Sequence, residues 1–252
     1  MSVLITVAVI VAMLLGLVKI YIEKIYDDPG AVSARELKID AQVYQETVDQ
    51  FEKCNHEDTF VVLIDPTHGG RDTGYTKGML MEKDVMLDVA LAAQQVIGKE
   101  KGIEVFLTRA DDNEISEEQR NYLYEILEPD MFIELHLSKS ADSKKMGTEA
   151  YYDSSFYDYR LNDAQFAEIL IENMARCTEG AVSKVEEDID ENYPVLDKKN
   201  INAVVVSLGY ISSEVEADAL TSDAYIANLG QGLAEGIMQS YDIRNKTADG
   251  RK

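Results

Sequence analysis

Two kinds of apolar pattern alternate along the chain from Phe60 to Tyr241. Short continuous apolar runs predict buried strands, and longer runs with helical spacing predict amphipathic helices. The predicted strands lie at 60–65, 105–107, 131–137, 147–152 and 203–208, and the acidic segment 181–192 reads as a loop. The predicted helices lie at 83–99, 116–127, 160–177 and 222–241. Strands that alternate with helices indicate an α/β domain whose largely parallel, twisted sheet is flanked by helices on both faces.

The first strand of this domain runs directly into a glycine-rich turn. Its apolar run, Val61 to Ile64, predicts a strand that is covered on both faces, and Asp65 and Pro66 end it. Gly69 and Gly70 then let the backbone bend. His68 therefore stands at the carboxyl end of a central strand, which is where open α/β sheets bind their ligands. A histidine that only caps the turn is the alternative.

An apolar segment opens the chain and carries no charged side chain before Lys19. Since about 20 apolar residues span a bilayer, we predict a transmembrane anchor over residues 1–22. A cleaved secretory signal is the alternative, but no basic region precedes the run and no small-residue cleavage site follows it closely. Lys19 and Lys24 follow the span, which favours a cytoplasmic body, while neighbouring acidic residues weaken that signal.

The rest of the chain divides by composition into three parts. Residues 23–58 are polar and acidic and predict a stalk or a helix at the domain edge. Residues 59–244 form the α/β domain, and the polar segment 245–252 predicts a flexible tail.

Charge and cysteine content narrow the functional classes. The formal net charge is −23, so the chain offers no basic surface for nucleic acid. Cys54 and Cys177 lie far apart and outside any CxxC pattern, which argues against a cysteine metal site. Whether these two cysteines pair stays open.

Two of the three histidines stand at equivalent places in the predicted sheet. His56 lies in a polar segment and most simply faces solvent, whereas His68 and His136 both lie near the carboxyl ends of strands. Imidazoles that converge in this way suit zinc, often with a carboxylate as a third ligand. Glu82, at the start of the next helix, is the candidate, although a carboxylate there also suits the helix dipole.

The chain from about Val61 to Tyr241 resembles the zinc-dependent N-acetylmuramoyl-L-alanine amidases of the third amidase family, which are cell-wall hydrolases. Seven ordered matches carry this resemblance: Ile64-Asp-Pro-Thr-His-Gly-Gly70, Gly78-Met-Leu-Met-Glu-Lys-Asp84, Leu107-Thr-Arg109, Ser116–Arg120, Met131–His136, Gly147–Tyr152 and Val204–Ser213. The resemblance implies zinc bound by His68, Glu82 and His136. It also implies hydrolysis of the amide between N-acetylmuramic acid and L-alanine in peptidoglycan.

The resemblance fails at the position of the family's catalytic glutamate, where this chain has Ser207. A serine hydroxyl is no general base near neutral pH without a base of its own, so we expect weak or lost turnover. Glu134 is a candidate substitute base, because residues i and i+2 of a strand share a face and Glu134 therefore points the same way as His136. A carboxylate that orients the ligand or faces solvent is the alternative. Thr67 and Ser138 also depart from the family pattern.

These observations predict a membrane-anchored amidase-like protein whose domain lies outside the cytoplasm and acts on peptidoglycan. An extracytoplasmic domain conflicts with the weak lysine signal, so orientation stays unresolved. The alternative is an inactive amidase-like domain that binds peptidoglycan or a protein partner.

Overall fold

The structure is a computed structural model that describes residues 59–98, 100, 102–154, 158, 160–178, 182–189, 192–197 and 201–249. The predicted anchor at 1–22, the predicted stalk at 23–58, His56 and Cys54 all lie outside these residues. Within the described ranges, no helix is both long enough and apolar enough to cross a bilayer.

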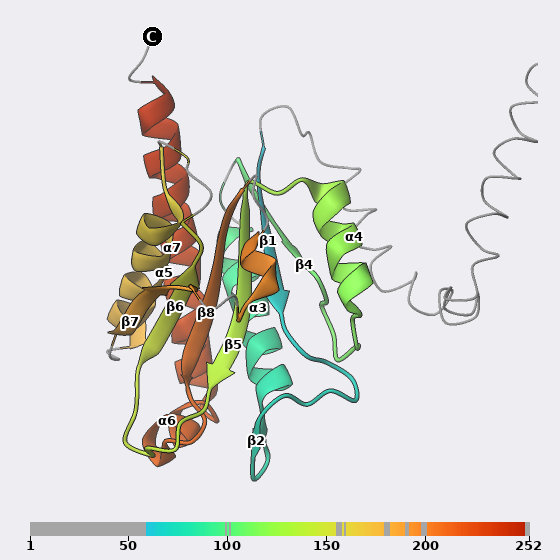
Figure 1. Cartoon of the computed structure of the whole chain (residues 1–252), viewed down its shortest axis with the longest axis vertical. Helices are drawn as coiled ribbons and strands as arrows, with labels where there is room; N and C mark the ends of the chain where they lie inside the picture. The colour runs from blue at the N-terminus through green and yellow to red at the C-terminus, as the bar shows by residue number, and fades with distance from the viewer. Residues whose placement is uncertain are drawn as a thin grey trace, which may run out of the picture. The chain divides into compact units, whose positions relative to one another are not determined.

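A six-stranded sheet forms the centre of the domain (Figure 1). Its strands run in the spatial order β4-β1-β5-β8-β6-β7. Their bounds are Phe60–Pro66 (β1), Ile103–Leu107 (β4), Met131–Ser138 (β5), Thr148–Tyr152 (β6), Val182–Glu187 (β7) and Asn202–Tyr210 (β8). All neighbours are parallel except β6 and β8, which are antiparallel. The largely parallel sheet predicted from the sequence is confirmed.

Strand β1 lies inside the sheet, with β4 on one side and β5 on the other. All seven of its residues are buried, as the continuous apolar run predicts. The carboxyl ends of β1, β5 and β8 therefore lie at one edge of the sheet. There His136 pairs in register with Ser207, and Ser207 pairs in register with Glu149 of β6.

Helices cover both faces of the sheet, which confirms the predicted layers (Figure 1). The longer helices are α3 (Glu82–Ile97), α4 (Glu117–Leu127), α5 (Asp163–Thr178) and α7 (Asp223–Asp249). Helices α3, α5 and α7 share one apolar core with one sheet face, and α4 packs on the other face. The predicted capping box is present at α4, where Ser116 and Gln119 each accept a backbone N–H.

Helix α7 packs against both α3 and α5. Gly232 lets it approach α5, because a Cβ at this position would collide with the Met174 backbone. The helix continues to Asp249 and so enters the segment that the sequence predicts as a flexible tail. Just before that segment, Arg244 Nη1 donates to the Asp130 carbonyl at 3.0 Å. The flexibility of residues 245–252 stays a prediction.

The acidic segment 181–192 is not all loop, because Val182–Glu187 forms β7 at the edge of the sheet and pairs with β6. An edge strand pairs on one side only, and charged residues commonly protect its open side. In β7 the charged residues are Lys184, Glu186 and Glu187. Because they interrupt the apolar pattern, this segment shows no strand signal in the sequence. Two short strands, β2 (Thr76–Lys77) and β3 (Leu80–Met81), form a hairpin between β1 and α3. A short 3-10 helix, η1 (Pro194–Asp197), and α6 (Glu214–Ala219) complete the described elements.

Candidate metal centre

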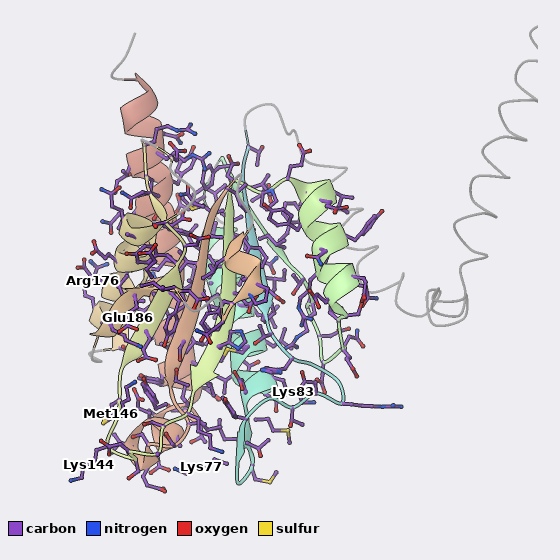
Figure 2. The ribbon with its side chains drawn as sticks, viewed as in Figure 1. Lys77, Lys83, Lys144, Met146, Arg176 and Glu186 are labelled. Carbon is purple, nitrogen blue, oxygen red and sulfur yellow. The ribbon has the colours of Figure 1, made fainter. Side chains whose placement is uncertain are left out.

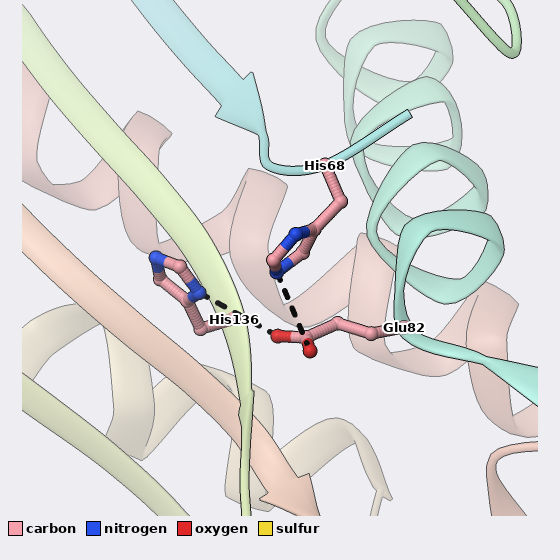
Figure 3. A group of neighbouring side chains, drawn as sticks. All are labelled: His68, Glu82 and His136. Atoms are coloured by element: carbon pink, nitrogen blue, oxygen red, sulfur yellow. Dashed lines mark ion pairs between the residues drawn. The ribbon is translucent and has the colours of Figure 1, made fainter. Parts of the chain in front are cut away.

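His68, Glu82 and His136 meet at the carboxyl edge of the sheet (Figure 3). Glu82 lies between the two imidazoles. Its Oε2 is 3.4 Å from His68 Nε2, and its Oε1 is 3.5 Å from His136 Nδ1. The three potential ligand atoms all lie within 4.8 Å of one another. The structure thus brings together the three residues that the sequence singled out, in a group that could hold a metal ion.

Glu82 is held in place as an ionised carboxylate. It is the first residue of α3 and is 1% exposed. The backbone N–H groups of Tyr75 and Leu137 each donate to one of its oxygens at 2.7 Å. Burial alone would raise the pKa of Glu82, but hydrogen bonds from the two histidines and the two backbone groups lower it well below its usual range. The resulting fixed negative charge favours a cation between the imidazoles.

Each histidine has an outer carboxylate partner on its second ring nitrogen. His68 Nδ1 lies 2.7 Å from Asp72 Oδ2, and His136 Nε2 lies 2.7 Å from Glu134 Oε1. An ionised carboxylate only accepts hydrogen bonds, so these ring nitrogens carry protons. His68 Nε2 and His136 Nδ1 then remain for a metal, and such outer carboxylates are typical of metal-binding histidines. Burial opposes the charged form of His136, yet Glu134 and Glu82 raise its pKa to about 9.

The turn that carries His68 is tied to the start of α3. His68 has a left-handed backbone, with φ of 64°. Lys83 Nζ, at the base of α3 (Figure 2), donates to the Gly70 carbonyl at 3.0 Å and to Asp112 Oδ2 at 2.6 Å. Asp112 in turn accepts the Gly70 N–H at 2.9 Å. These contacts hold two of the three site residues at a fixed separation.

Arg109 also ties the turn that carries His68 to the start of α3, and we call these contacts the Arg109 clamp. Its side chain is almost fully buried and donates to the carbonyls of Pro66 (2.7 Å), Thr67 (3.1 Å) and Lys83 (2.7 Å). Two of these carbonyls directly precede His68, and the third directly follows Glu82. Sequence reasoning gave Arg109 no role beyond a motif match, although an arginine directly after a buried strand was a usable signal.

A cleft of about 500 Å³ lies at the metal-binding group. His68, Thr67 and His136 line one side, and Arg120 and Tyr124 of α4 are among the residues on the rest of its wall. The Tyr193 ring also lines it, 5.9 Å from the His136 ring. This volume is within the range of small-molecule sites, so the cleft can admit part of a larger substrate.

Ser207 lies beside His136 on β8, buried and 1% exposed. Its hydroxyl donates to Ser138 Oγ at 2.7 Å, and Ser138 Oγ donates to Glu149 Oε2 at 3.0 Å. Burial would raise the pKa of Glu149, but hydroxyl donors from Tyr210, Ser138 and Tyr151 lower it. The position where the resemblance expects a catalytic carboxylate therefore holds a hydroxyl in a buried polar network.

Glu134, the candidate substitute base, lines the cleft but is engaged with His136. This contact fits the alternative interpretation, that of a carboxylate that orients the ligand. Sequence reasoning missed Asp72 and Glu149. Asp72 could have been found from its position four residues after His68 in the same turn.

The open α/β sheet thus carries, at its carboxyl edge, a cleft and a His/Glu/His group that could hold a metal ion. The sequence profile of the N-acetylmuramoyl-L-alanine amidases matches residues 62–239, and the chain belongs to this family. The family resemblance drawn from the sequence motifs is thereby confirmed.

Individual relatives agree with this family. The sporulation-specific N-acetylmuramoyl-L-alanine amidase of Bacillus subtilis is 25% identical over 201 residues, which cover 75% of this chain and 71% of the relative. The probable cell wall amidase LytH of Staphylococcus aureus is 29% identical over 179 residues; the match covers 70% of this chain but only 56% of LytH.

Solved structures show the same fold. The catalytic domain of CwlV, an N-acetylmuramoyl-L-alanine amidase from Bacillus (Paenibacillus) polymyxa var. colistinus, superposes with a TM-score of 0.66 at 28% identity. The match covers 73% of this chain and 99% of CwlV's domain. An N-acetylmuramoyl-L-alanine amidase from Clostridium difficile 630, at 24% identity, has a TM-score of 0.67 over 74% of this chain and 98% of that one.

Proposed function

We propose that this chain is a membrane-anchored, zinc-dependent N-acetylmuramoyl-L-alanine amidase with slow turnover. The observation that carries the proposal is the His68–Glu82–His136 group, in which each imidazole is oriented by its own outer carboxylate. Family membership supplies the reaction class, which is hydrolysis of an amide in the cell wall. The scissile bond joins the lactyl group of N-acetylmuramic acid to the first L-alanine of the stem peptide.

The donor set fits zinc in kind and spacing. Two imidazole nitrogens and one carboxylate are a common catalytic set, with a fourth position left open. Zinc–ligand bonds of about 2.0–2.1 Å in a tetrahedron separate neighbouring ligand atoms by about 3.3–3.4 Å. The two separations across Glu82 are 3.4 and 3.5 Å. These two separations involve different oxygens of Glu82, and the three ligand atoms lie within 4.8 Å of one another, so a bound ion would draw them closer together.

Zinc, when bound, supplies an activated water and polarises the scissile carbonyl. The residues of this chain position that chemistry. The Glu82 carboxylate would offset part of the positive charge of the metal. Asp72 fixes the tautomer of His68, and Glu134 fixes that of His136. The cleft, which is lined by residues of β5 and α4, would admit the substrate.

The proton acceptor is the weak part of this site. Ser207 offers a hydroxyl, and Glu134 already bonds the proton on His136 Nε2. Loss of a positioned base typically costs about 10²–10⁴-fold in rate. This supports slow hydrolysis and also favours a second candidate, a domain of the same fold that binds peptidoglycan or a protein without cutting it.

The test incubates the zinc-loaded full-length protein with purified peptidoglycan and measures released stem peptides. We expect slow release that disappears in His68→Ala, which should also lose bound zinc by metal analysis. Robust turnover would refute the binding-domain candidate. Complete absence of release with zinc bound would refute the amidase proposal and leave the metal site standing. Absence of zinc in both proteins would refute the metal site.

A substituted base gives a sharper test. Ser207→Glu places a carboxylate beside His136 and opposite Glu149, and we expect turnover to rise by about 10²–10⁴-fold. Ser207→Gln is the matched control. Its side chain is as long as that of glutamate and disturbs the same hydrogen bond to Ser138, but it cannot act as a base. An equal response of the two variants would show that a missing base is not what limits the rate.

The membrane anchor at residues 1–22 and an extracytoplasmic domain are further parts of this proposal. A domain on the cytoplasmic side could not reach peptidoglycan. Reporter fusions at the carboxyl end and protease protection of intact cells decide the orientation. Cytoplasmic signals in both assays would exclude peptidoglycan as the substrate.

A further inference from the structure

Thr67 places a hydroxyl beside the metal-binding group. It lies between the end of β1 and His68, is 6% exposed, and lines the cleft. Its Oγ1 lies 3.5 Å from His136 Nδ1, which is the ring nitrogen that faces Glu82. Thr67 is also one of the positions at which the sequence departs from the family pattern that it resembles.

The proton of this hydroxyl already takes part in a hydrogen bond. Thr67 Oγ1 donates to the Leu135 carbonyl at 2.5 Å, and a carbonyl can only accept. With a metal bound, His136 Nδ1 would not compete for the proton, because its lone pair would bind the metal. Toward any other group, including a ligand beside His136 Nδ1, the hydroxyl oxygen can then only accept.

The hydroxyl is also held in position. The Thr67 carbonyl accepts from buried Arg109 Nη2 at 3.1 Å, which fixes the backbone on the carboxyl side of the residue. Threonine is branched at Cβ and has restricted χ1 rotation, and the short bond to Leu135 selects one rotamer. The oxygen cannot turn its proton toward the site without breaking that buried bond.

We propose that Thr67 selects the occupant of the open coordination position of the metal. A ligand whose bound atom carries a proton can donate to Thr67 Oγ1, whereas a bound atom with lone pairs alone is repelled. A water molecule satisfies this rule. The inference rests on the proposed metal site and concerns Thr67 as a positioning residue for whatever binds there.

The test compares two monoanionic ligands that differ in that proton. Azide binds a metal through a nitrogen without hydrogen, and the methanesulfonamide anion binds through a nitrogen that keeps one N–H. Each is titrated into the Co²⁺-loaded full-length protein, and the visible absorption of cobalt reports binding without any turnover. Chelator competition confirms that each variant is loaded.

Thr67→Val keeps the shape of the side chain and removes the hydroxyl. We expect methanesulfonamide to bind about tenfold more weakly and azide severalfold more tightly, which corresponds to about one hydrogen bond. Thr67→Ser restores the hydroxyl and should retain the wild-type preference. A purely structural role would change both affinities in the same direction.

Changes in the same direction, or changes below about twofold for both ligands, would overturn the inference and leave the metal site intact. If the wild-type protein binds no Co²⁺, the proposed metal site is refuted and this inference falls with it.

Discussion

Gly74 offers the most direct test of how this site is assembled. A Cβ at this position would lie 2.6 Å from Glu82 Oε2 and 2.7 Å from His68 Cδ2. Both distances are well inside van der Waals contact, and Glu82 cannot move aside without losing the N–H of Tyr75. Gly74→Ala should therefore separate two of the three proposed ligands.

The size of the effect follows from two contributions. Gly74 has φ of 60°, and a left-handed backbone costs alanine about 1–2 kcal/mol. Forced overlap in a packed site adds about 1–3 kcal/mol. We expect the free energy of unfolding to fall by about 2–5 kcal/mol and zinc affinity to fall by at least about 100-fold.

Gly78→Ala is the matched control. Gly78 lies nearby, in the turn between β2 and β3, with φ of 62°, but a Cβ there would meet nothing within 4 Å. This variant bears the backbone cost alone, so it should lose about 1–2 kcal/mol of stability and keep its zinc affinity. Urea denaturation gives the stabilities, and chelator competition gives the affinities. Equal zinc affinity in the two variants would refute the proposed ligand geometry.

Two further predictions concern buried charges away from the ligand atoms themselves. Arg109→Lys cannot reach all of the carbonyls that Arg109 contacts, so we expect zinc affinity to fall about tenfold or more. Arg244→Lys, the same change at a residue of α7 that bonds the Asp130 carbonyl, should lower stability alone. Equal zinc loss in both variants would contradict this role of Arg109. Burial raises the pKa of Asp163 to about 7, so the folded protein binds this proton more tightly than the unfolded chain and loses stability as pH rises from about 4 to 7. Asp163→Asn should therefore raise the unfolding free energy by about 4 kcal/mol at pH 8 and by less than half of that at pH 5, and a gain independent of pH in denaturant titrations would exclude this explanation.

Local signals in the sequence were sufficient to predict most of the strands and helices. The apolar run of β1 predicted a strand buried on both faces, and the capping box at Ser116 predicted the start of α4. These signals act between residues a few positions apart, where hydrophobic spacing and backbone hydrogen bonds dominate. The approach of His68 and His136 was also predictable, because carboxyl ends of neighbouring parallel strands share one edge of a sheet.

Contacts between distant parts of the chain decided the rest. Strand β7 forms because β6 offers it an edge, and its charged residues alone gave no strand pattern. The Arg109 clamp, the network of Ser207, Ser138 and Glu149, and the orientation of the Thr67 hydroxyl depend on strand register. Thr67 and Leu135 are 68 residues apart, and Ser207 and Ser138 are 69 apart. Residue type and spacing therefore determined which side chains could bind a metal, while only the tertiary structure decided which partners hold their protons, because a hydrogen bond depends on the position of both atoms.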